Sequence, residues 1–305
     1  MEISVIIPVY NKAQYIEKCL KSLLEQSFDS FEIVCVDDGS TDGSGDILDR
    51  LAIAEPLIKV IHTDNGGVTA ARRRGVEEAK GKYILFVDAD DGLLPHAIQM
   101  LYDAIELNDA DEVIAPYQNQ YGVVTDSGCR GWIAPTDVIK DYLALRNSFP
   151  PIWGMLLRRD IILDGCLDIP RDIYLGEDIL FHVRYLTKVT KVFCISNRCY
   201  VYSEGITSYP RINLEYESRY DQLMKAALQP VWAEMEPYFR LRQLKVYEKF
   251  IDSKQFDVYA RYYHQLKGHL NRQIPLSDRL VFLLPPRLAY YLVHAYKWWL
   301  LNRNQ

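Results

Sequence analysis

The chain has 305 residues, a length that fits one large domain or one domain with an appendix. Hydrophobic residues make up 49% of it and charged residues 25%, which excludes wholesale disorder and fibrous repeats. With 35 Lys and Arg against 41 Asp and Glu, the formal net charge is −6, which argues against non-specific binding of nucleic acid.

Cysteine usage and targeting signals predict a cytoplasmic protein. The six cysteines lack the two-residue spacing of zinc ligands, and Cys19 and Cys35 fall in apolar patterns that suit free thiols. The first residues show no basic stretch followed by an apolar one, so we expect no signal peptide. We also find no run of about 18 apolar residues, the length that a bilayer-spanning helix needs.

The first 115 residues alternate apolar strands with amphipathic helices. Strands are predicted at residues 3–9, 31–36, 57–61, 83–87 and 111–115. Helices are predicted at residues 15–24, from Thr41-Asp42 onward, at 68–79 and from Pro95 onward. This alternation is typical of a doubly wound α/β sheet, in which ligands bind outside the carboxyl ends of the strands.

The rest of the chain divides into two parts near Tyr209-Pro210. Residues 116–209 show a weaker, mixed α and β pattern, and residues 210–305 look helical and rich in Tyr, Trp, Arg and Lys. We therefore expect an α/β domain over residues 1–209, with residues 1–115 as its ligand-binding half, and a helical C-terminal extension.

A first acidic cluster follows the strand predicted at residues 31–36. Asp37 and Asp38 lead into a Gly-Ser-Thr-Asp turn, and ordinary turn and helix-cap chemistry would explain these residue types. At the end of a buried strand, however, such a carboxylate can accept the imide N–H of a uracil or a ribose hydroxyl. The hydrogen-bonding logic therefore favours a nucleotide site.

A second acidic cluster, Asp88, Asp90 and Asp91, follows the strand at residues 83–87. Three acids at the end of a hydrophobic strand are costly unless a cation or hydroxyls satisfy them. If the strand continued, Asp88 and Asp90 would point the same way and Asp91 the opposite way. Mg²⁺ or Mn²⁺ suits such oxygen ligands. The alternative is that Asp91 only begins a turn before the next helix.

Between the two clusters, Gly66-Gly67 precedes a helix whose N-terminus attracts anions. Arg72, Arg73 and Arg74 in its second turn fan over roughly 200° of the helix. One arginine can therefore address a phosphate or a base while the others are solvated, and we favour Arg72.

In order and spacing, these motifs resemble those of family 2 glycosyltransferases. The resemblance rests on Pro8-Val9-Tyr10-Asn11, Asp37 to Asp42, Gly67 to Gly75 and Asp88-Ala89-Asp90-Asp91. It implies a GT-A fold, a Rossmann-like, mostly parallel sheet flanked by helices, and a nucleotide-sugar donor. The donor-binding residues that it implies are Pro8, Val9, Tyr10, Asn11, Asp37, Asp38, Arg72, Asp88 and Ala89. Asp90 then resembles the carboxylate that holds Mn²⁺ or Mg²⁺.

The resemblance continues more loosely to about residue 208. Gly176-Glu177-Asp178 is similar to the motif whose Asp acts as catalytic base, although a helix beginning with acids would also explain it. Trp153 lies in a segment that usually precedes this motif, and Trp153, Glu177 and Asp91 are candidates for acceptor contact or support. The sequence has no His between His182 and His264, so the metal shell is left to Asp90, phosphate oxygens and water.

The resemblance implies an inverting glycosyltransferase that transfers a hexose or N-acetylhexosamine from a nucleotide-sugar, which we expect to be a UDP-sugar. The acceptor that it implies is a glycan or a lipid-linked glycan, in the assembly of bacterial cell-surface polysaccharide or glycolipid. The alternatives are a non-catalytic nucleotide-sugar-binding protein and a nucleotidyltransferase on a similar sheet.

The tail is open to three interpretations. Residues 270–305 hold five Arg or Lys and one Asp among short apolar stretches. This segment fits three roles: residues 280–301 could contact the inner face of the cell membrane, pack on the catalytic domain, or form a homodimer interface.

Overall fold

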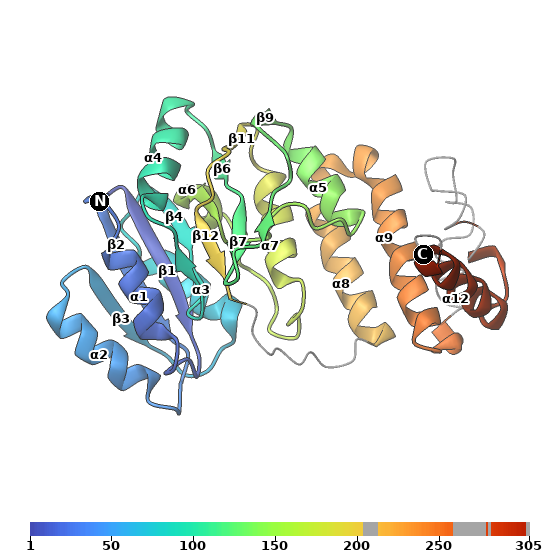
Figure 1. Ribbon diagram of the computed structural model, residues 1–305, viewed down its shortest axis with the longest axis horizontal. Helices are drawn as coiled ribbons and strands as arrows, with labels where there is room; N and C mark the ends of the chain where they lie inside the picture. Colours follow the sequence, from blue (N-terminus) through green and yellow to red (C-terminus); the bar gives the residue numbers. More distant parts are fainter. Residues whose placement is uncertain (204–212, 259–278, 280–281, 303–305) are drawn as a thin grey trace. The chain divides into compact units, whose positions relative to one another are not determined.

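The structure of the chain is a computed structural model that describes residues 1–203, 213–258, 279 and 282–302 (Figure 1). The chain forms two compact units. The first contains Met1–Val138 and Asn147–Arg211, and the second contains Ile139–Arg146 and Ile212–Gln305. The boundary predicted at Tyr209-Pro210 lies outside the described residues.

An eight-stranded, mostly parallel sheet forms the centre of the first unit (Figure 1). Its strand order is β3-β2-β1-β4-β10-β6-β11-β9. The strands are β1 (Ile3–Val9), β2 (Phe31–Asp37), β3 (Ile58–His62), β4 (Tyr83–Phe86), β6 (Glu112–Ile114), β9 (Gly131–Ile133), β10 (Met155–Arg158) and β11 (Val192–Cys194). Every residue of β1 and β2 is buried, as expected for strands covered on both faces. The predicted α/β fold is confirmed.

Helices follow the first four parallel strands in the predicted alternation. They are α1 (Ile16–Leu24), α2 (Ser44–Ala54), α3 (Val68–Glu78) and α4 (Ala97–Leu107). The approach of α3 to β1 is especially close, because a Cβ added at Gly75 would lie 2.4 Å from Ile6 Cγ2. A residue without a side chain therefore lets this helix pack directly on the sheet.

Two of these helices begin later than predicted. α2 begins at Ser44 rather than at Thr41-Asp42, because Asp42 Oδ1 accepts the N–H of Ser44 at 3.0 Å and Gly43 has a left-handed φ of 91°. α4 begins at Ala97 rather than at Pro95, after His96 with a φ of 62°. In both places, residues predicted to be helical form the turn before the helix.

The segment after residue 115 adds strands to two sheets of the first unit. β10 inserts between β4 and β6 and runs antiparallel to both, so the predicted fifth strand does not lie beside the fourth. A smaller sheet has the order β5-β12-β7-β8, formed by β5 (Gly92–Leu93), β7 (Tyr117–Asn119), β8 (Val124–Thr125) and β12 (Tyr200–Tyr202). The helices of this segment are α5 (Pro135–Leu143), α6 (Arg159–Leu163) and α7 (Glu177–Leu186).

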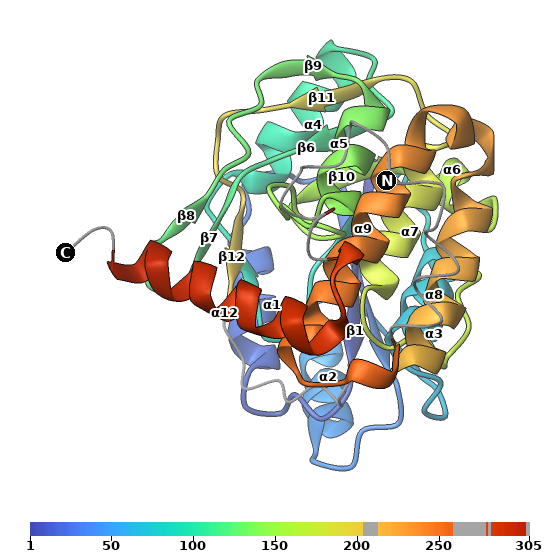
Figure 2. The same ribbon diagram turned by 90° about the vertical axis from the view of Figure 1, so that its right-hand side faces the viewer.

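The second unit is mainly helical, which confirms the predicted helical C-terminal region. Its main helices are α8 (Leu214–Ala227), α9 (Trp232–Asp252) and α12 (Pro286–Asn302). Tyr247 and Phe250 of α9 form a core with Phe282 and Ala289, and α12 packs along α9 (Figure 2). None of the helices described here is long and apolar enough to cross a bilayer.

Candidate functional site

A pocket of about 480 Å³ lies in the first unit at the carboxyl ends of β1, β2 and β4, and its volume is typical of small-ligand sites. Most of the predicted site residues line it: Pro8, Val9, Tyr10, Asp38, Arg72, Asp88, Ala89, Asp90, Asp91 and Glu177. Four predicted site residues, Asn11, Asp37, Trp153 and Asp178, do not belong to the lining.

Asn11 and Asp37 hold the loops that shape the pocket. Asn11 has a left-handed φ of 52°, and its Oδ1 accepts the N–H of Thr41 at 2.8 Å. Asp37 Oδ1 accepts the N–H of Ser40 at 3.0 Å, and its Oδ2 lies 2.9 Å from His62 Nδ1. Burial would raise the pKa of Asp37, but the hydrogen bonds from Ser40 and His62 lower it. Both residues therefore act on the backbone of the turn between β2 and α2.

Asp38, in contrast, faces the pocket. Its Oδ1 accepts the N–H of Gly66 at 2.7 Å, and its Oδ2 accepts the N–H of Gly67 at 2.8 Å. A carboxylate has about four lone-pair sites, so these two bonds leave acceptor capacity for a ligand. Of the two acids that were alternatives for uracil recognition, Asp38 is the one that lines the pocket.

Arg72 lies at the centre of the acidic groups. Its side chain is 5% exposed, and its Nη2 donates to Asp88 Oδ1 at 2.8 Å. Burial would lower the pKa of Arg72, but the charges of Asp88 and Glu177 raise it. The buried Nε has no hydrogen-bond partner among the described residues, which leaves one donor free for a ligand. Arg73 and Arg74, in contrast, are half-exposed and pair with carboxylates away from the pocket.

The acids Asp88, Asp90 and Asp91 stand on a turn rather than on a strand. β4 ends at Phe86, and the N–H of Asp91 donates to the carbonyl oxygen of Asp88 at 2.9 Å. The strand alternation considered for these acids therefore does not apply, and all three line the same pocket. Asp91 accepts hydrogen bonds from Tyr200 and from the backbone of Ser203, both at 2.6 Å. Burial, together with the charge of Asp88, raises the pKa of Asp91 to about 7.

Glu177 and Asp178 occupy the first turn of α7, directly after Gly176 with its φ of 78°. Glu177 lines the pocket, and Asp178 Oδ1 accepts the N–H of Ile179 at 2.7 Å. Burial raises the pKa of both carboxyls, and the positive charge of Arg72 opposes that rise. A carboxylate with a raised pKa is a better proton acceptor near neutral pH.

Trp153 supports the pocket through an aromatic neighbour. Its ring stacks on Tyr202, with centroids 5.4 Å apart and planes at 22°, and it also stacks on Tyr200. Tyr202 lines the pocket, so Trp153 supports one of its walls from behind.

Gly67, Val68 and Ala71 of the lining belong to the recognised Gly67 to Gly75 motif, whereas the sequence analysis missed Lys12, Asn65, Tyr202 and Ser203. Lys12 and Asn65 directly adjoin motifs that were recognised, so proximity in the sequence was the available signal. Tyr202 and Ser203 come from β12 and the residue after it, and tertiary contacts bring them here, namely the pairing of β12 with β5 and the hydrogen bonds of Tyr200 and Ser203 to Asp91.

Asp90 is the residue predicted to hold a divalent cation. The described part of the chain does not gather three His, Cys, Asp or Glu side chains at one metal-binding point. Mg²⁺, however, takes one or two carboxylates and completes its shell with phosphate oxygens and water. Lys12 Nζ pairs with Asp90 Oδ2, so this carboxylate already attracts a cation. Asp90 therefore fits Mn²⁺ or Mg²⁺ that is bound jointly with a phosphate ligand.

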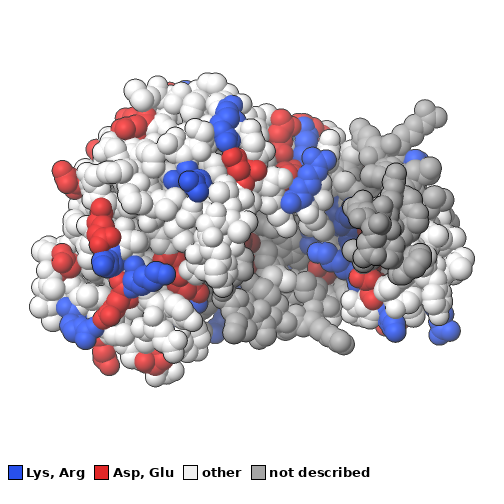
Figure 3. Space-filling model, in the orientation of Figure 1, with Lys and Arg blue, Asp and Glu red and all other residues white. Residues whose placement is uncertain are grey.

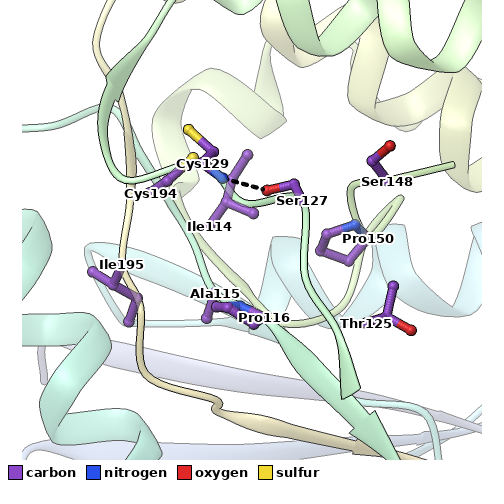
Figure 4. Close-up of a pocket in the computed structure, with 10 residues that line it drawn as sticks. All are labelled: Ile114, Ala115, Pro116, Thr125, Ser127, Cys129, Ser148, Pro150, Cys194 and Ile195. Carbon is purple, nitrogen blue, oxygen red and sulfur yellow. Dashed lines mark hydrogen bonds between the residues drawn. The ribbon is translucent and has the colours of Figure 1, made fainter. Parts of the chain in front are cut away.

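A second cavity, shown in Figure 4, is too small for such a ligand. Its volume is about 10 Å³, room for roughly one water molecule. Ser127, Cys129 and Cys194 are among its lining residues, and Ser127 Oγ accepts the N–H of Cys129 at 3.2 Å. The larger pocket is therefore the candidate functional site.

Comparison with known proteins assigns the family. Residues 4–164 match the family described as glycosyl transferase family 2. The chain is 42% identical to the glycosyltransferase GlyG of Streptococcus pneumoniae over 38% of its length, and 31% identical to the uncharacterized glycosyltransferase EpsJ of Bacillus subtilis over 69%. These alignments cover 39% of GlyG and 63% of EpsJ, so the chain spans only part of these relatives.

The fold also has solved counterparts. The structure of S. aureus TarS 1-349 in complex with UDP-GlcNAc superposes with a TM-score of 0.61 at 20% sequence identity, covering 92% of this chain and 90% of that one. At this identity the similarity establishes the fold. The family match and the fold agree, and the chain belongs to the family 2 glycosyltransferases with a GT-A fold.

Proposed function

We propose that the chain is an inverting glycosyltransferase that moves a hexose or N-acetylhexosamine from a UDP-sugar to an acceptor hydroxyl. One observation carries the proposal: Asp38 from the loop after β2, Arg72 from helix α3, and Asp88 and Asp90 from the loop after β4 line a single pocket. A nucleoside diphosphate needs acceptors for its base and ribose and positive charge for its phosphates, and this set supplies both kinds of group.

The first step is donor binding. Asp38, held by two backbone N–H groups, accepts the imide N–H of uracil, and Asp88 accepts a ribose hydroxyl. Arg72 donates to the diphosphate through guanidinium N–H groups that Asp88 leaves free. Pro8, Val9 and Tyr10 form the wall at the end of β1. TarS, which shares this fold, was crystallised with UDP-GlcNAc, and that supports a UDP-sugar as donor.

The second step is transfer. The acceptor oxygen attacks the anomeric carbon while Asp178 takes its proton, and the bond from that carbon to the diphosphate oxygen breaks with its electron pair. A single displacement inverts the anomeric centre. A divalent cation at Asp90, when bound, neutralises the charge that develops on the leaving diphosphate. The raised pKa of Asp178 and its place beside Arg72 support this role.

The acceptor is proposed by class. Family members commonly act in cell-surface polysaccharide or glycolipid assembly, so we propose a glycan or lipid-linked glycan acceptor. Two alternatives remain distinguishable by experiment. A non-catalytic binding protein would bind UDP-sugars without hydrolysis or transfer. A nucleotidyltransferase usually requires a basic, glycine-rich phosphate loop after its first strand, a position where this chain has Pro8-Val9-Tyr10-Asn11.

Calorimetric titration tests the donor assignment. UDP, UDP-glucose, UDP-galactose, UDP-N-acetylglucosamine, UDP-N-acetylgalactosamine and UDP-glucuronic acid are each titrated into the protein with Mn²⁺ and with chelator. We expect one UDP-sugar to bind more tightly than UDP and only with Mn²⁺. If no UDP species binds, the proposed donor is wrong.

We also propose that α12 contacts a membrane surface at the inner face of the cell membrane. Leu288, Tyr291 and Leu292 are 54%, 70% and 46% exposed and lie on one face of the helix at spacings of three and four residues. Ala289, on another face, is fully buried in the core of the second unit. The basic residues of the C-terminal segment suit anionic lipid, which favours a membrane over a second copy of the chain.

Vesicle sedimentation tests this contact with a double variant, Leu288→Glu with Tyr291→Glu. We expect wild type to sediment with vesicles of phosphatidylglycerol and phosphatidylcholine, and the double variant to stay in solution. Ile53→Glu, at an apolar residue on α2 that is 88% exposed, is the matched control and should sediment like wild type. If wild type does not bind vesicles but forms a homodimer that the double variant disrupts, the membrane contact is wrong. The exposed face of α12 would then contact a second copy of the chain.

A further inference from the structure

Lys12 is a pocket residue to which the sequence analysis gave no role. It lies in the loop between β1 and α1, and its Nζ pairs with Asp90 Oδ2 across the pocket. Its backbone is held in place, because its N–H donates to Ser44 Oγ at 2.8 Å and the Ser44 side chain is fully buried. The side chain is 33% exposed, so the ammonium group can move while the backbone stays fixed.

Lys12 is important because the pocket has more acidic than basic side chains. Its described lining contains five carboxylates, Asp38, Asp88, Asp90, Asp91 and Glu177, and two basic side chains, Lys12 and Arg72. On the outer face seen in Figure 3, by contrast, basic and acidic side chains are interspersed. A diphosphate that enters an acidic pocket is repelled unless positive groups face it.

The two basic residues are not equivalent. Arg72 is almost fully buried and hydrogen-bonded to Asp88, so its position is fixed. Lys12 has a single ion-pair partner among the described residues, Asp90, which is the carboxylate predicted to hold the metal. Because a lysine ammonium is a point charge on a flexible stem, it can exchange a carboxylate for a phosphate.

We propose that Lys12 changes partner during donor binding. Lys12 is the counter-ion of Asp90 in the donor-free pocket, and it turns to the diphosphate when a divalent cation and the donor bind together. It thereby keeps Asp90 neutralised without metal, disfavours binding of metal alone, and adds positive charge at the phosphates. This inference rests on the proposed function, because it requires a nucleoside diphosphate ligand.

Two binding measurements test the exchange in wild type, Lys12→Met and Lys12→Arg. In the first, Mn²⁺ alone is titrated and bound metal is followed by paramagnetic resonance. We expect Lys12→Met to bind Mn²⁺ about three- to tenfold more tightly than wild type, since a competing ion pair is removed. In the second, UDP is titrated calorimetrically at saturating Mn²⁺. We expect Lys12→Met to bind UDP about tenfold more weakly and Lys12→Arg to bind it nearly as well as wild type.

The matched control is Lys21→Met, which removes an exposed lysine from α1 whose side chain is 74% exposed. It should leave both affinities unchanged. The partner exchange is wrong if Lys12→Met binds Mn²⁺ no more tightly than wild type, or if it binds UDP equally well. If wild type itself binds no UDP, the proposed function fails and the diphosphate half of the inference fails with it. The titration with Mn²⁺ alone still decides whether Lys12 competes for Asp90.

Discussion

The buried carboxyl of Asp91 should make the stability of the protein fall as pH rises toward neutrality. Its pKa in the folded chain is about 7, because burial and the neighbouring charge of Asp88 disfavour ionisation, and an unfolded Asp has a pKa of about 3.9. Between these values the folded chain binds a proton that the unfolded chain has released. This contribution to stability is therefore complete below about pH 4 and is lost as pH rises through about 7.

The size of the effect follows from the two pKa values. Each unit of difference corresponds to about 1.4 kcal/mol, so between pH 5.5 and pH 8 the free energy of unfolding should fall by about 2 kcal/mol from this group. Urea denaturation of wild type and Asp91→Asn at both pH values measures it. The variant loses a hydrogen bond with Tyr200 at every pH, but it lacks the titration, so its stability relative to wild type should rise by about 2 kcal/mol at pH 8.

Asp126→Asn provides the control for this experiment. A hydrogen bond from Arg130 lowers the pKa of Asp126, so this exposed carboxyl is ionised in both states throughout the range. Its stability relative to wild type should not change between the two pH values. A flat result for Asp91→Asn as well would refute the reasoning. It would mean that the hydrogen bonds from Tyr200 and Ser203 outweigh burial and keep Asp91 ionised.

Three further variants test the site and the fold. Asp178→Asn should retain UDP-sugar binding by calorimetry and lower turnover about 10²- to 10⁴-fold, and unchanged turnover would exclude Asp178 as base. Asp90→Ala should weaken Mn²⁺-dependent UDP binding by at least about tenfold, and an unchanged affinity would place the metal elsewhere. Gly75→Ala should destabilise the protein by about 1–3 kcal/mol in urea denaturation, because its methyl group would overlap Ile6, and unaltered stability would contradict the close packing of α3 on β1.

The strands and helices of the first half of the fold could be predicted because each depends mainly on the residues of its own segment. β1 is a run of seven buried residues with neighbours on both faces, and such a strand needs an almost continuous apolar sequence. The first residues of the helices were predicted less accurately. Asp42 favours both a turn and a helix cap, and only the left-handed conformation of Gly43 decides between them. The position of β10 depends on pairing with β4 and β6, which lie far from it in the sequence, so no local pattern revealed it.

In the candidate site, too, some features could be predicted from the sequence and others depend on the tertiary structure. Sequence motifs pointed to Asp38, Arg72, Asp88 and Asp90, because the three acids follow strands and Arg72 lies in the second turn of a helix that a Gly-Gly pair precedes. Their detailed geometry was not accessible, since it depends on a turn at residues 88–91 that a continuing strand would not form. Lys12 was missed for a different reason. A single lysine forms no sequence motif, and its role can be inferred only from the carboxylate with which it pairs across the pocket.

The acids of the site separate into two groups by the partners that they have. Asp37 and Asp91 accept hydrogen bonds from backbone N–H groups and side chains of neighbouring segments and hold these segments in place. Asp88 pairs with the buried and fixed Arg72, whereas Asp90 pairs with the mobile ammonium group of Lys12. A carboxylate that is satisfied by the fold has little to gain from a ligand, whereas one that is held by an exchangeable counter-ion can transfer its interaction to a metal at small cost. Asp90 is therefore the acid where donor binding should act at the smallest cost, and its substitution should change affinity more than stability.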